Sequence, residues 1–123
     1  MTVTEHVEVA THLAGLESIW EDGLADLYAL YRPHTAPAVA LAAALVESAV
    51  ALQQLGTGAP EPPRLLLGDL CLARASRLLA ATREQHLQVA FARAVERTAA
   101  AAAGGPSAVP LRELLLSAIR SRP

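Results

Sequence analysis

Residues 38–52 are the strongest constraint on the fold of this 123-residue chain, because they are apolar on nearly every side of a helix. Glu47 and Ser48 are the exceptions. A helix that is apolar all round belongs at the centre of a bundle or at a subunit interface. Few other helices remain to cover it, so the sequence predicts an oligomer, formed with a second copy or with a partner chain.

The composition predicts an all-α fold. The chain contains 27 alanines and 21 leucines, both strong helix formers. Aromatic residues make up only 3%, which argues against a β-sandwich or barrel. Proline and glycine divide the chain into about five expected helices and no strand, at residues 4–31, 37–55, 64–81, 83–103 and 111–120. We therefore expect one helical-bundle domain over residues 1–123.

Local signals predict where some of these helices begin and end. Thr4 is the expected N-cap of the first helix, and Gly15 and Gly23 leave open whether that helix splits. Thr82, with Gln85 three residues later, has the capping-box pattern and predicts the start of the fourth helix. A continuous helix through Thr82 is the alternative. Residues 56–63, with three prolines and two glycines, predict a loop.

Charge and cysteine content exclude several classes of function. All ten basic residues are arginines, they are dispersed among twelve acidic residues, and the net charge is −2, so we expect no nucleic-acid binding. Cys71 is the only cysteine, which permits no internal disulfide or Cys-based zinc site and fits a reducing cytoplasm. Residues 36–55 come nearest to a membrane span, but Pro37 and Glu47 interrupt them, and no integral membrane segment is expected.

Two acidic clusters are candidates for metal binding. Glu5, Glu8 and His12 have the spacing of a helical metal site, but no second helix offers a matching pair. A second cluster lies in the same predicted helix and comprises Glu17, Glu21, Asp22 and Asp26. We interpret both clusters as solvated or structural, and expect no metal and no other cofactor. A small metal-dependent enzyme that uses these carboxylates is the minor alternative.

Residues 65–80 resemble a helix of the trans-polyprenyl diphosphate synthase family, whose pattern is Leu-x-Gly-Asp-x-x-x-x-x-Ala-x-x-x-Leu. Gly68 and Asp69 supply the central pair. The resemblance implies an isoprenoid-synthase-like helical fold, with an Asp-Asp-x-x-Asp motif ending the preceding helix. This chain has Gln54, Leu55 and Gly56 there. Neutral side chains cannot hold the Mg²⁺ that activates an allylic diphosphate, so we expect no catalysis by this chain alone.

A chain with the Gly-Asp helix but without the aspartate motif is similar to the non-catalytic small subunit of heterodimeric synthases, such as the small component of heptaprenyl or hexaprenyl diphosphate synthases. The resemblance implies an accessory or regulatory role in isoprenoid biosynthesis and a catalytic synthase subunit as partner. A stand-alone homodimeric scaffold without enzymatic activity is the alternative. Asp69 is expected near a helix start, in a structural role. The interface is expected on the two most apolar helices, at Ala49, Leu52, Leu66, Leu67, Leu70, Cys71, Arg74 and Leu78.

Overall fold

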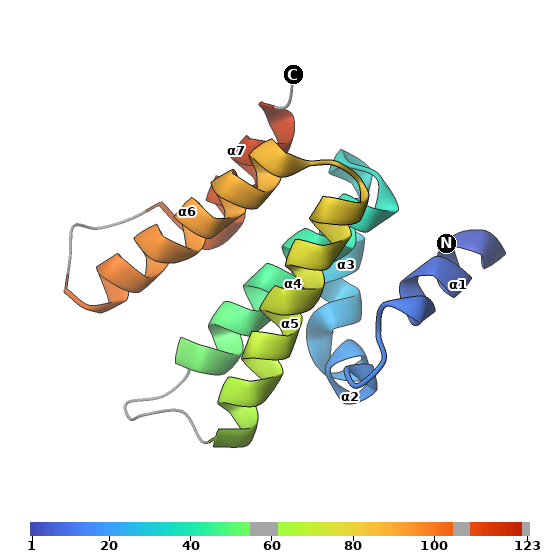
Figure 1. Cartoon of the computed structure of the whole chain (residues 1–123), viewed down its shortest axis with the longest axis horizontal. Coiled ribbons are helices and arrows are strands. Elements are labelled where there is room, and N and C mark those ends of the chain that lie inside the picture. The colour runs from blue at the N-terminus through green and yellow to red at the C-terminus, as the bar shows by residue number, and fades with distance from the viewer. Residues whose placement is uncertain (55–61, 105–108, 122–123) are drawn as a thin grey trace.

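The computed structural model describes residues 1–54, 62–104 and 109–121, and these ranges are helical with no strand (Figure 1). The all-α prediction is confirmed. Residues 55–61, which include most of the predicted loop at 56–63, lie outside the described residues, as does the side chain of Gln54. Pro62 and Pro63 were predicted in the loop but are the first residues of a helix, where proline is tolerated. The elements are α1 (Val3–Thr11), α2 (Glu17–Ile19), the π-helical turn η1 (Trp20–Leu24), α3 (Ala25–Tyr31), the 3-10 turn η2 (Arg32–His34), α4 (Pro37–Gln54), α5 (Pro62–Ala81), α6 (Gln85–Ala102) and α7 (Leu111–Arg120).

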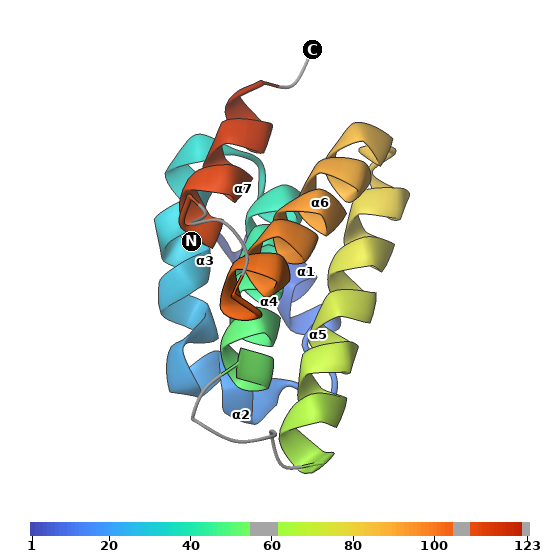
Figure 2. The same cartoon turned by 90° about the vertical axis from the view of Figure 1, so that its left-hand side faces the viewer.

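Helix α4 is the centre of the fold, with the other long elements arranged around it (Figure 2). Every residue at positions 39–46 is at most 3% exposed. Helices α1, α3, α5, α6 and α7 all contact α4. The chain therefore covers its own apolar helix, and the sequence argument that α4 needs a second chain to bury it no longer holds.

Helix α4 is covered more completely than the sequence predicts, because residues 4–31 do not form one continuous helix. Gly15 and Gly23 adopt φ values of +83° and +135°, a region that glycine occupies readily. The segment folds back on itself there and lays α1 and α3 against α4 as separate elements. The cap prediction was wrong by two residues, since the backbone N–H of Glu5 donates to Thr2 Oγ1 at 3.0 Å.

The junction between α5 and α6 also differs from the capping-box prediction. The Thr82 hydroxyl bonds back to the carbonyls of Leu78 and Leu79, at 3.1 Å each, so it extends the end of α5. Arg83 adopts a φ of +58°, which breaks the helix, and α6 begins at Gln85. Both the capping box and the continuous helix are therefore wrong. The expected helix at Leu111–Arg120 is confirmed as α7.

Candidate functional site

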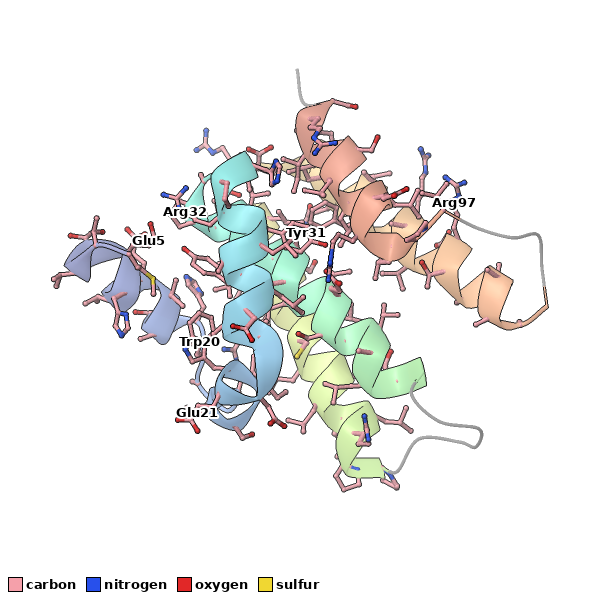
Figure 3. All side chains as sticks on the ribbon, turned by 180° about the vertical axis from the view of Figure 1, so that it is seen from behind. Glu5, Trp20, Glu21, Tyr31, Arg32 and Arg97 are labelled. Carbon is pink, nitrogen blue, oxygen red and sulfur yellow. The ribbon has the colours of Figure 1, made fainter. Side chains whose placement is uncertain are left out.

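Glu5 is a buried carboxylate that joins α1 to α3 and η2. The Tyr28 hydroxyl donates to Glu5 Oε2 at 2.7 Å, and Arg32 Nε donates to Glu5 Oε1 at 3.1 Å. Tyr28 and Arg32 are four residues apart and so share one side of α3–η2. Figure 3 shows Glu5 and Arg32 facing one another across this junction. The hydrogen bonds from Tyr28 and then Arg32 lower the pKa of Glu5, so this carboxylate is an acceptor within the fold.

Glu47 is the centre of a second, similar network, which joins α3, α4 and α7. The Tyr31 hydroxyl donates to Glu47 Oε2 at 2.7 Å. Arg112 Nε and Nη2 donate to Glu47 Oε1 at 3.2 and 2.7 Å. Tyr31 is fully buried, and burial, followed by the neighbouring carboxylate, raises its pKa. The one acidic residue in the apolar α4 is thereby paired with a cation and held by a hydroxyl.

The Gly68–Asp69 pair has a packing role between α4 and α5. Gly68 is buried, and a Cβ there would lie 2.7 Å from Gln53 Cγ, so the Gln53 side chain occupies the space that glycine leaves. Gln53 Nε2 also donates to Asp69 Oδ1 at 3.1 Å. Asp69 is about two turns inside α5, because the helix already begins at Pro62. The predicted position near a helix start is therefore wrong, while the structural role agrees with these contacts.

The predicted interface residues divide into core and surface groups. Ala49, Cys71 and Leu78 are at most 3% exposed and belong to the chain's own core. Burial raises the pKa of the Cys71 thiol to about 11, as fits an unreactive core thiol. The side chain of Arg74 is used inside the chain, where it donates to the carbonyls of His12 and Ala14.

The surface group consists of four leucines. Leu66 is 69% exposed, and Leu52, Leu67 and Leu70 are half-buried. Of the eight predicted positions, these four and the half-buried Arg74 have side chains that a partner could reach on the folded chain. The interface prediction stays open for them.

Helix α6 diverges from α5 beside α4 (Figure 1). Side chains of these three helices line an apolar groove. We call it the α4–α5–α6 groove. Its volume is about 270 Å³. Gln88 Nε2 donates to the Ser76 carbonyl at 3.0 Å along one edge, and the other walls are apolar. The lining residues are Val46, Leu72, Ala75, Ser76, Leu79, Gln88, Phe91, Ala92 and Val95.

The acidic residues of the N-terminal segment do not converge on a site. Glu17, Glu21, Asp22 and Asp26 are all exposed, as expected for a solvated face, and Figure 3 shows Glu21 at the periphery. Within residues 1–54, 62–104 and 109–121, no group of three or more His, Cys, Asp or Glu could hold a metal ion. In the same described ranges, no helix is both long and apolar enough to span a bilayer.

Sequence reasoning missed both tyrosine–glutamate–arginine networks and the groove. In the sequence Glu47 is only a polar interruption of an apolar helix, and nothing local marks Arg112 as its partner, 65 residues away. Comparison with protein-family models, with curated proteins and with solved structures found no match to this chain. The relationship to trans-polyprenyl diphosphate synthases, which is carried by the motif in residues 65–80, stays a prediction.

Proposed function

We propose that this chain is a non-catalytic subunit that acts by association, and that its α4–α5–α6 groove receives an apolar helix of a catalytic trans-polyprenyl diphosphate synthase subunit. The observation that carries the proposal is the groove itself. Seven of its nine lining residues are apolar. Leu65, which is 39% exposed, lies two turns before Leu72 on the same side of α5 and extends the apolar wall.

The walls favour a helix as the occupant. All three are α-helices, whose backbone groups are hydrogen-bonded along the helix, so an extended peptide would find few free donors or acceptors to pair with. A helix can instead place apolar side chains at positions i, i+3 or i+4, and i+7 into such a groove. Burial of its apolar surface contributes about 25 cal/mol per Å².

The class of partner comes from the sequence resemblance. In the synthase family the Gly-Asp helix and its neighbour pack across the dimer interface, and α5 carries that motif here at Gly68 and Asp69. The aspartates that would bind Mg²⁺ are replaced by Gln54, Leu55 and Gly56. A partner that supplies an intact aspartate motif would complement this difference.

The test mixes the purified chain with the aspartate-containing synthase of the same genome and measures the complex by light scattering and prenyl condensation by product analysis. Ala92→Glu places a carboxylate at the groove wall. We expect it to weaken the complex by roughly tenfold or more, because the unpaired charge would lose its hydration on binding. Ala73→Glu is the matched control, since Ala73 is exposed on α5 and outside the groove.

Three results would contradict the proposal. One is the absence of a complex with the synthase, and another is equal binding by the Ala92→Glu and Ala73→Glu variants. The third is a stable homodimer that forms alone and is unchanged by the synthase, which would support the scaffold alternative. Circular dichroism of each variant verifies that the helices are intact.

A further inference from the structure

Helix α5 has one side packed on α4 and the opposite side open to solvent, and Figure 2 shows it along the right-hand edge of the bundle. Five exposed residues follow one another along the open side, at spacings of three or four. They are Leu66, Asp69, Ala73, Arg77 and Ala80, and we call them the α5 outer strip. Leu66 is 69% exposed. The strip shares no residue with the lining of the α4–α5–α6 groove.

The two charges of the strip are not neutralised within the fold. Asp69 and Arg77 are separated by about 12 Å along the helix, and they form no ion pair with one another. Among the described residues, Arg77 takes part in no hydrogen bond or ion pair. Asp69 accepts a hydrogen bond at Oδ1 from the Gln53 amide, which carries no charge. Both side chains therefore keep their charge available at the surface.

The order of residues in the strip is self-complementary. Asp69 lies four residues before Ala73 and Arg77 lies four residues after it. Suppose that two α5 helices pack antiparallel, with a two-fold axis through Ala73. Each residue then faces the one at the same separation on the other side of Ala73 in the second copy. Asp69 faces Arg77, Arg77 faces Asp69, and Leu66 faces Ala80. The small Ala73 side chain lies at the axis, where the two helices approach most closely.

We propose that the α5 outer strip is a self-association surface, on which a second copy of this chain docks with its α5 helix antiparallel. Charge complementarity identifies the occupant, because one antiparallel copy neutralises both charges of the strip at once. A parallel copy in the same register would place Asp69 against Asp69 and Arg77 against Arg77, and like charges disfavour that arrangement. The strip thus specifies the orientation of the second copy.

The size of the strip sets the strength of this association. A contact between one helix and its copy buries less than the roughly 1,200 Å² of a typical stable interface, so we expect a reversible dimer with a Kd of roughly 100 µM. Exposed ion pairs contribute little when they form. Two like charges brought face to face oppose association more strongly, so charge reversal is the most sensitive test of the surface.

The experiment measures self-association of the full-length chain by sedimentation equilibrium, from about 10 µM to 1 mM. Asp69→Arg and Arg77→Asp each place like charges against one another, and each should weaken the dimer by about tenfold or more. An equimolar mixture of these two variants should form a heterodimer, because the two arginines of one chain then face the two aspartates of the other. Arg93→Asp is the matched control, an exposed arginine on α6, and should self-associate as the wild type does.

Three results would overturn the proposal. One is a wild-type chain that stays monomeric at about 1 mM, tenfold above the expected Kd. Another is self-association of Asp69→Arg or Arg77→Asp as strong as that of the wild type. The third is a mixture of the two variants that stays monomeric although circular dichroism shows both chains to be folded.

The outcome is separable from that of the proposed function. Arg77→Asp should bind the synthase as the wild type does, whereas Ala92→Glu should self-associate as the wild type does. A dimer that forms alone and then binds the synthase agrees with both proposals. A dimer that does not bind the synthase supports only the self-association surface.

Discussion

Helices α1 and α4 are held in the same bundle by different kinds of contact. Helix α4 is fixed by burial, since all of residues 39–46 are in the core. Helix α1 buries only Glu5 and Val9, and its outer side leaves Val3 and Val7 at 83% and 60% exposure. Hydrogen bonds from Tyr28, Arg32 and Arg74 hold the α1 segment instead. Disrupting α4 should therefore unfold the bundle, whereas disrupting the α1 contacts should loosen one helix.

The largest expected effect follows from removing a side chain from α4. Leu45 is fully buried, so Leu45→Ala should lower the free energy of unfolding by about 3 kcal/mol through lost burial and a new cavity. Urea denaturation measures the change. Val7→Ala on the exposed side of α1 should change it by less than about 0.5 kcal/mol. Equal losses in the two variants would contradict the contrast between these helices.

A smaller effect is expected from the network around Glu47. Tyr31→Phe removes the hydroxyl that donates to Glu47 and leaves the Arg112 contacts in place. One such hydrogen bond contributes about 1 kcal/mol, so the free energy of unfolding measured by urea denaturation should fall by that amount. If Tyr31→Phe is as stable as the wild type, the hydroxyl does not contribute to holding α3 on α4.

Acidification should act on α1 before it acts on the core. Hydrogen bonds from Tyr28 and Arg32 lower the pKa of Glu5 in the folded chain, so its contribution to stability is present at neutral pH and is lost as the pH falls through that lowered pKa. The only tryptophan, Trp20, has its ring 5.8 Å from that of Tyr28 and reports on this region by fluorescence.

The Glu5→Gln variant provides the control for the acid response. It cannot ionise at this position, so its fluorescence should change less with acid than that of the wild type. Hydrogen exchange at neutral pH should be faster in α1 of this variant and unchanged in α4. Uniformly faster exchange along the chain would contradict a local role for Glu5.

The smallest expected signal is the reaction of Cys71 with a thiol reagent. The thiol is fully buried beneath α4 and its pKa is raised to about 11, so at pH 8 the folded chain should be nearly unreactive. Labelling should accelerate only with urea, along the same transition as the loss of helix. Fast labelling without urea would show that the α4–α5 contact opens locally, as is expected of α1.

The elements that the sequence predicts well are those whose signals are local. Pro37 begins α4 and Leu111–Arg120 is α7, because proline placement and apolar periodicity act within a few residues. The capping-box prediction at Thr82 was wrong because the Thr82 hydroxyl donates instead to the Leu78 carbonyl in the preceding turn. The networks and the groove depend on residues brought together by helix crossing angles, and no periodic pattern in the sequence encodes those angles.

Helix α3 carries two tyrosine hydroxyls that bind carboxylates on different elements. Tyr28 and Tyr31 are three residues apart, so their side chains leave the axis about 60° apart. A rotation of α3 about its own axis that favours one hydroxyl would draw the other out of range of its acceptor. The two hydroxyls together therefore restrict rotation of α3, which is bonded on one side to Glu5 of α1 and on the other to Glu47, the residue that also binds Arg112 of α7.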